Sequence, residues 1–163
     1  MTDQRDIEIA PFSGAKLALF LGPDLLVIQR DDRPDIPWPG HWDLPGGGRE
    51  GGETPMDCAL RETCEEVNLT LSPDQITWSR SYLRPHGRVW FFAAHLPAAR
   101  VAGVRLGDEG QGWCLMAPQT YCQHPLAVPH FAETLTLYLG QQAEAGDSGD
   151  LTERPPAAEA GGR

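Results

Sequence analysis

One short stretch of this chain combines glycines, glutamates and an arginine in a pattern suited to binding a metal ion. A glycine-rich segment, 47–53, is followed by residues with a helical signal. There, Glu62, Glu65 and Glu66 are spaced three and four residues apart, and such positions share one face of an α-helix. Three carboxylates on one face repel each other unless a cation lies between them. Oxygen ligands of this kind favour Mg²⁺ or Mn²⁺, and no Cys/His pair at ligand spacing points to Zn²⁺.

A solvated acidic helix face is the alternative explanation of these glutamates. Two features of the sequence argue against it. The helix is entered through glycines, where backbone can approach a ligand closely, and Arg61 lies beside the cluster, where a guanidinium can hold a carboxylate through two bonds. Exposed glutamates also usually pair with a lysine four residues away, and none is present here.

A helix from Pro55 to about Val67 must carry the three glutamates. Thr54 is a typical N-cap residue, proline is favoured at the first helical position, and Asn68 can end the helix. Around it, alternating and continuous apolar runs separated by turn residues predict strands and a final helix. The expected strands are 16–21, 25–30, 76–83, 89–96 and 113–116, and the last helix runs from about 129 to 142.

Length and charge limit the functions open to this chain. Its 163 residues amount to one domain, expected at 12–143 between a flexible N-terminus (1–11) and a disordered acidic tail (144–163). The net charge of −10 disfavours nucleic-acid polymers and anionic membranes as partners. The longest apolar run, Val89–Ala94, is too short to span a membrane. No secretory signal and no C-x-x-C pair are visible, so we expect a cytoplasmic protein, monomeric or homodimeric.

The spacing of the charged residues resembles the Nudix box. The match consists of Gly47, five residues, Glu53, seven residues, Arg61-Glu62, and then Glu65-Glu66. Thr63 stands where that family usually has an aliphatic residue, and Asn68 stands where it usually has glycine. Threonine can turn its methyl group inward, and asparagine is the next-best residue for a left-handed helix end. The approach segment 42–47 resembles the same family, and the order of elements is compatible over 12–143.

The resemblance implies an α/β Nudix fold, an α/β/α sandwich with a mixed central sheet and a loop–helix–loop catalytic box. It also implies Mg²⁺-dependent hydrolysis, with Mn²⁺ as a possible substitute, of a diphosphate linkage in a nucleoside di- or triphosphate derivative. In the segment 107–111, Glu109-Gly110-Gln111 resembles a loop of the MutT-type branch, whose glutamate reaches the metal. The implied metal ligands are the Gly47 carbonyl, Glu62, Glu65, Glu66 and Glu109. Glu62 and Glu109 are also candidate bases, and Glu53 and Arg61 are expected to orient the helix carboxylates.

The sequence leaves the substrate open. The asparagine with which MutT-like enzymes read a purine has no counterpart in 125–129. ADP-ribose hydrolases of the superfamily carry a proline shortly after the box, and Pro85 stands 16 residues past Leu69, so an ADP-ribose or nucleotide-sugar pyrophosphatase is the alternative. A catalytically silent, nucleotide-sensing module is a third reading, although such modules usually lose box carboxylates. The candidate substrate contacts are Arg30, Trp38, Arg84 and Arg88.

Overall fold

Seven strands form one mixed sheet in this computed structural model, which describes residues 11–153. The strands are β1 (Gly14–Leu21), β2 (Asp24–Gln29), β3 (Trp42–Asp43), β4 (Gly46–Gly48), β5 (Ile76–Arg84), β6 (Gly87–Leu96) and β7 (Gly112–Met116). Their order is β3-β2-β1-β6-β5, with β4 paired to β1 and β7 paired to β2. Only β1 and β6, among the named pairs, run parallel. The predicted strands are all present, within two residues at each end.

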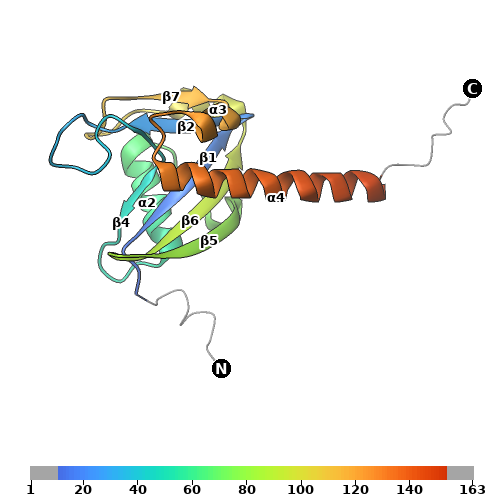
Figure 1. Ribbon diagram of the computed structural model, residues 1–163, viewed down its shortest axis with the longest axis horizontal. Helices are drawn as coiled ribbons and strands as arrows, with labels where there is room; N and C mark the ends of the chain where they lie inside the picture. The colour runs from blue at the N-terminus through green and yellow to red at the C-terminus, as the bar shows by residue number, and fades with distance from the viewer. Residues whose placement is uncertain (1–10, 154–163) are drawn as a thin grey trace, which may run out of the picture.

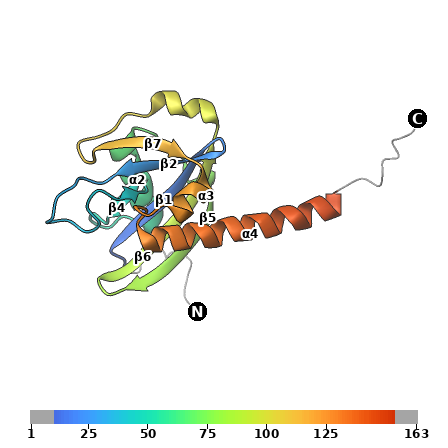
Figure 2. The ribbon, with the colours of Figure 1, turned by 45° about the horizontal axis from the view of Figure 1, so that its top comes forward.

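Helices cover both faces of the sheet, as expected for an α/β/α sandwich. These are α2 (Pro55–Val67), α3 (Pro118–Gln123) and α4 (Pro129–Glu153), with short 3₁₀ turns η1 (Pro73–Gln75) and η2 (Ala98–Gly103). Successive side chains of a strand point to opposite faces, and in β1 both sets are apolar. Leu17 and Leu19 join the core beneath α2, whereas Ala18 and Phe20 join the core beneath α4. Figures 1 and 2 show the two helices on either side of β1.

The sheet opens between β1 and β2. The two strands pair only near their hairpin, at Phe20–Leu25 and Leu21–Asp24. Farther along, β1 pairs with β4 and β2 pairs with β3, so the segment 42–48 lines the opening between the diverging strands. The opening faces α2, the helix that follows the segment 42–48 in the chain. This helix carries the three glutamates named in the sequence analysis.

Local signals in the sequence set both ends of α2. The Thr54 side chain accepts a hydrogen bond from the backbone N–H of Asp57, and Asn68 ends the helix in the left-handed conformation, with φ of 65°. Thr63 is fully buried and its hydroxyl donates to the Ala59 carbonyl at 2.7 Å. Both departures from the usual box pattern are therefore accommodated as predicted.

The last helix is longer than the sequence analysis predicted. α4 runs to Glu153 instead of ending near Gln142, so the first part of the predicted disordered tail, 144–153, is helical. Residues 141–145 (QQAEA) favour helix and carry it past the expected end, and the first prolines occur only at 155–156. Figure 1 shows α4 projecting well beyond the sheet. The rest of the predicted tail, and residues 1–10 of the predicted N-terminus, lie outside the described residues. Within 11–153, no helix is both long and apolar enough to cross a bilayer.

Candidate active site

An acid-lined cavity of about 670 Å³ lies where the opening of the sheet meets α2. Its wall combines side chains of the box helix, the glycine strand β4, the sheet opening and the loop before β7. The lining residues are Lys16, Arg30, Asp43, Gly46, Gly47, Gly48, Glu50, Glu62, Glu65, Glu66, Asp108 and Glu109. The structure thus brings together all five residues that the sequence analysis named as metal ligands.

Arg61 organises the carboxylates at one side of this cavity. It donates from Nε and Nη2 to the two oxygens of Glu53, at 3.0 and 2.8 Å. Its Nη1 lies 3.1 Å from an oxygen of Glu62 and 3.1 Å from an oxygen of Glu65, while Nη2 also donates to the Gly48 carbonyl at 2.9 Å. The guanidinium hydrogen bonds lower the pKa of Glu53 to about 2. Arg61 and its partner Glu53 thus lie beside the metal-ligand candidates, and Arg61 contacts two of them, Glu62 and Glu65. Neither Glu53 nor Arg61 lines the cavity itself.

Glu62 and Glu66 are the partly buried glutamates of the box that line the cavity. Burial raises the pKa of Glu66 to about 7, against the opposing effects of Lys16 and of a hydrogen bond from the Gly46 N–H at 2.7 Å. Burial also raises the pKa of Glu62. The Glu62 carboxyl group packs on Gly47, where an added Cβ would stand 2.6–2.7 Å from its atoms. For both carboxyl groups, burial outweighs the effect of the nearby cations on the pKa.

The Gly47 carbonyl, the predicted backbone ligand, accepts a hydrogen bond from the Cys58 thiol at 3.5 Å. Cys58 is fully buried, and burial raises the pKa of its thiol to about 12. The thiol therefore stays protonated at neutral pH, as is typical of a packing residue with no nucleophilic role.

Two cations face the acids across the sheet opening. The buried carboxylate of Asp43 lies 3.1 Å from Lys16 Nζ and 2.7 Å from Arg30 Nη1. Lys16 also donates to the carbonyls of Leu44 and Gly46, at 3.2 and 3.3 Å. The cavity thus has carboxylates on its α2 side and an ammonium and a guanidinium on its β1–β2 side. Sequence reasoning missed Lys16 and Asp43 as site residues; the one available signal was a lysine inside the otherwise apolar strand β1.

The loop before β7 completes the acid wall. Backbone N–H groups of Arg105 and Gly107 donate to the last carbonyls of α2, at Val67 and Glu66. Gly107 approaches the Glu65 carbonyl so closely that a Cβ would collide with it. At its other end, Gln111 bonds the strand end of β2 through its backbone and its side chain. Glu109 lines the cavity together with Glu66.

The donor set fits Mg²⁺ or Mn²⁺ in chemical type, because it consists of carboxylates and carbonyls. As placed, however, no group of three Asp, Glu, His or Cys side chains within residues 11–153 stands ready to hold a metal ion. The geometry gives the reason. Arg61 already donates hydrogen bonds to Glu62 and Glu65, and the Gly46 N–H donates to an oxygen of Glu66. A cation would have to replace part of the Arg61 contact.

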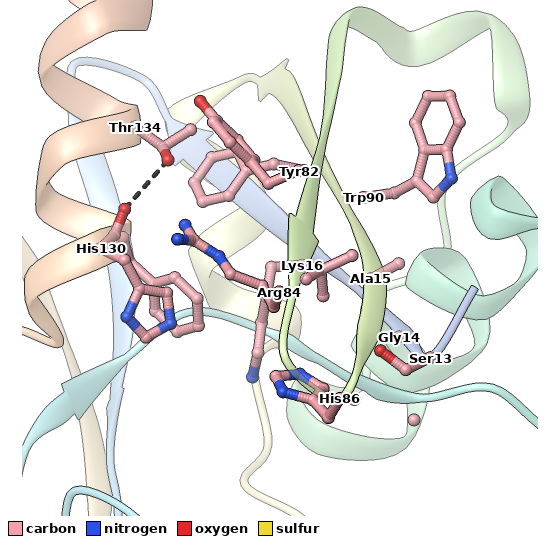
Figure 3. Close-up of a pocket in the computed structure, with 15 residues that line it drawn as sticks. Ser13, Gly14, Ala15, Lys16, Tyr82, Arg84, His86, Trp90, His130 and Thr134 are labelled. Carbon is pink, nitrogen blue, oxygen red and sulfur yellow. Dashed lines mark hydrogen bonds between the residues drawn. The ribbon is translucent and has the colours of Figure 1, made fainter.

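A second cavity, of about 280 Å³, adjoins the first on the α4 side of the sheet. The two share the wall made by Lys16, Gly47 and Gly48. Figure 3 shows Tyr82, Arg84 and Lys16 facing the start of α4, with Trp90 turned away toward the other side of β6. The aromatic lining of this second cavity includes Phe131, which the sequence analysis did not name as a site residue. Phe131 does pack against the core, and its ring also lies 5.4 Å from Lys16 Nζ.

The predicted substrate contacts separate into two groups. Arg84 lines the second cavity and Arg30 lines the first. Trp38 and Arg88 line neither: Trp38 packs its ring near His41 and His130, and Arg88 Nη1 donates to Ser81 Oγ at 2.9 Å. The expectation for Trp38 came from its residue type and that for Arg88 from its place near Pro85, and the fold directs both side chains elsewhere.

Fold and site together define an α/β/α protein with a box of carboxylates on a helix beside an open mixed sheet. The family model described as "NUDIX domain" matches residues 13–138. The chain therefore belongs to the Nudix family, and the resemblance seen in the sequence is confirmed.

Comparisons with individual proteins agree with the family. Over 78 residues, 46% of this chain, it is 46% identical to a nucleoside triphosphate pyrophosphatase/Nudix hydrolase fusion protein of Bifidobacterium longum, but the match spans only 16% of that relative. A C. elegans Ap4A hydrolase superposes with a TM-score of 0.63 at 24% identity, covering 80% of this chain and 98% of the other. A MutT protein from Methanosarcina mazei Go1 gives 0.63 at 17% identity, covering 80% and 94%. The two structures support the fold.

Proposed function

We propose that this protein is a divalent-cation-dependent pyrophosphohydrolase of nucleoside di- or triphosphate derivatives. One observation carries the proposal. The first, acid-lined cavity (the acid cavity) and the second cavity, lined by Tyr82, Phe91 and Phe131 (the aromatic cavity), share the wall formed by Lys16, Gly47 and Gly48. A molecule with a charged diphosphate and a flat organic ring can occupy both cavities at once. Membership of the Nudix family supports the same reaction class.

Glu62, Glu65, Glu66 and Glu109 would hold the cation, with Mg²⁺ favoured and Mn²⁺ a possible substitute. Bound there, the cation would offset charge on the diphosphate and lower the pKa of water. The chain's own cations act on the opposite side. Lys16 and Arg30, fixed by Asp43, lie where they can neutralise the outer oxygens of the same diphosphate.

A carboxylate near the cation must accept the proton of the attacking water. Glu62 and Glu109 both line the cavity and both remain candidates. Glu53 and Arg61 are positioning residues in this scheme, because Arg61 touches Glu62 and Glu65 and is itself fixed by Glu53. The protein supplies positioning and electrostatic stabilisation, and no covalent intermediate is required.

A nucleotide panel tests the proposal. The purified full chain would be incubated with Mg²⁺ and ribo- and deoxynucleoside triphosphates, oxidised guanine nucleotides, ADP-ribose and a nucleotide sugar, followed by phosphorus analysis of the products. We expect release of phosphate, pyrophosphate or a nucleoside monophosphate from at least one member. The ADP-ribose and sugar arms decide between the two branches left open by the sequence.

Glu66→Gln is the matched inactive variant, since the amide oxygen can still accept from Gly46 while the charge is lost. Glu144→Gln, on an exposed position of α4, is the control. We expect Glu66→Gln to lose most of the turnover and Glu144→Gln to retain it. Absence of turnover for the whole panel, with Mg²⁺ binding equal in Glu66→Gln and wild type, would refute the proposal and favour a silent module.

A further inference from the structure

Arg84 stands out in the aromatic cavity because a buried donor of its side chain has no hydrogen-bond partner among the described residues. It comes from the end of β5, with its guanidinium 5.1 Å from the Tyr82 ring. Its Nε is buried and has no hydrogen-bond partner among residues 11–153. A buried donor without a partner costs free energy, so a ligand that supplies an acceptor would be favoured there. Figure 3 shows the guanidinium directed toward α4, across the cavity.

The rest of the lining favours acceptor-bearing ligands over donor-bearing ones. The residues that line this cavity include no Asp, Glu, Asn or Gln. Two of its hydroxyl groups are already committed as donors to backbone carbonyls, Ser13 to Arg88 and Thr134 to His130. His130 is neutral at pH 7, since burial and the nearby Arg84 lower its pKa. Arg84 is thus the cation left to select a ligand, because Lys16 is paired with Asp43.

The side chains that line the cavity favour a nucleobase over a phosphate group as its occupant. Tyr82, Phe91 and Phe131 give it an aromatic lining, which suits a flat ring and would desolvate a phosphate without replacing its water. Arginine binds a base best through its fork of donors, and the edge that matches this fork is the O6/N7 edge of guanine. An adenine presents an amino donor at the same place, and uracil or cytosine lacks the second acceptor.

We propose that Arg84 determines the base specificity of this protein, selecting 6-oxopurine nucleotides over 6-aminopurine nucleotides. The inference rests on the proposed function, because it assumes that the base of the substrate occupies the cavity beside the acid cluster. It goes beyond that function by naming the class of base and the residue that reads it. Guanine and hypoxanthine share the two acceptors that the guanidinium would contact.

A series of nucleotide analogues tests which atoms are read. With Mg²⁺, kcat/KM of the wild-type chain would be measured for GTP, ITP, 7-deaza-GTP and ATP. We expect GTP and ITP to exceed ATP by about tenfold or more, and 7-deaza-GTP, which lacks the N7 acceptor, to fall toward ATP. Equal values for GTP and ATP, or for GTP and 7-deaza-GTP, would overturn the inference.

Variants then test whether Arg84 is the reader. Arg84→Gln should bring the GTP/ATP ratio of kcat/KM to one or below, because glutamine pairs with the N6/N7 edge of adenine. Arg84→Lys keeps the charge but loses the fork, so the ratio should also fall. Arg80→Gln is the matched control: Arg80 lies on the same strand, 5.5 Å from the same Tyr82 ring, but does not line the cavity. Its ratio should equal that of wild type.

A general loss of stability would lower all rates but not the ratio, so the ratio separates recognition from folding. If Arg84 instead anchored a phosphate, Arg84→Gln would slow every nucleotide equally, and that result would overturn the inference. Calorimetric binding of GDP, IDP and ADP measures the same preference without turnover. A wild-type chain that hydrolyses no member of the nucleotide panel but prefers GDP and IDP would refute the proposed function while supporting Arg84 as the reader. Equal binding of GDP, IDP and ADP would refute Arg84 as the reader.

Discussion

Arg61 holds Glu53 through two parallel hydrogen bonds, from Nε to Oε2 at 3.0 Å and from Nη2 to Oε1 at 2.8 Å. The pair is mostly shielded from solvent, with side-chain exposures of 22% and 14%. From this fixed position the third guanidinium nitrogen reaches Glu62 and Glu65. The pair therefore connects the glycine loop to the carboxylate face of α2, and its loss should affect both stability and catalysis.

Replacing Arg61 by lysine should remove the two-point contact while keeping the charge. We expect Arg61→Lys to lower the free energy of unfolding by roughly 1–3 kcal/mol, since Glu53 and the Gly48 carbonyl lose charged donors. Turnover should fall by about tenfold or more, because the carboxylates lose their orientation. Urea denaturation and steady-state kinetics measure the two effects.

The pair of Arg33 and Asp35 provides the control for this experiment. Its hydrogen bonds are equally short, but both side chains are more than half exposed. Arg33→Lys should change the free energy of unfolding by at most about 1 kcal/mol. A similar loss in both variants would contradict the role assigned to Arg61.

Gly47→Ala should displace Glu62. The new Cβ would stand 2.6–2.7 Å from the Glu62 carboxyl atoms, closer than real contacts allow. Since that carboxyl group lies at the edge of a cavity, it can move away, and we expect turnover to drop much more than stability. Gly52→Ala, whose Cβ would have nothing within 4 Å, should leave both unchanged. Full activity in Gly47→Ala would show that the position of Glu62 is not critical.

Metal affinity should depend on Glu62 and Glu65 although neither is free in the structure. Each must exchange a contact with Arg61 for the cation. Electron paramagnetic resonance of free Mn²⁺ measures the affinity directly. We expect Glu65→Gln and Glu62→Gln to weaken binding by roughly tenfold or more, and Asp57→Asn, on an exposed position of the same helix, to have no effect. Unchanged affinity in both glutamate variants would place the metal elsewhere.

Acid should destabilise the fold through His130. Burial, together with the charge of Arg84, lowers the pKa of His130 below 6.5. The unfolded chain then binds more protons, so this contribution to stability is complete above about pH 6.5 and is lost as the pH falls through the pKa of the folded state. His130→Gln should therefore show a shallower decline of unfolding free energy between about pH 6.5 and pH 5.

An NMR titration of the same histidine tests the cause. Arg84→Gln removes a positive neighbour, so the midpoint of the His130 ring resonance should move to higher pH. A midpoint that is unchanged in Arg84→Gln would mean that the two side chains do not interact across the cavity.

The box helix could be predicted from sequence because its signals are local. Thr54, Pro55 and Asn68 fix its ends, and helical spacing alone places Glu62, Glu65 and Glu66 on one face. The same holds for the β5–β6 hairpin, where short-range turn signals decide the pairing. These features depend on residues that are near each other along the chain.

The residues that were missed depend on long-range pairing. Lys16 reaches the site only because β1 leaves β2 and pairs with β4, and Asp43 becomes its partner through the same opening of the sheet. Phe131 lies at a core position of its helix and also lines a cavity, which periodicity cannot distinguish. Trp38 was chosen by residue type and Arg88 by its place near Pro85, whereas their contacts are set by the loop and the strand around them.

The central claim is that the carboxylates of α2 carry a cation-dependent cleavage of a nucleotide phosphoanhydride. ³¹P NMR of the full chain with Mg²⁺ and each member of the nucleotide panel, repeated with excess EDTA and with Glu66→Gln, tests it most directly. The account predicts that the anhydride resonances of at least one nucleotide disappear with the wild-type chain and Mg²⁺, and persist in the other two samples. Persistence of every nucleotide in all three samples, or disappearance at the same rate with EDTA or with Glu66→Gln, would contradict it.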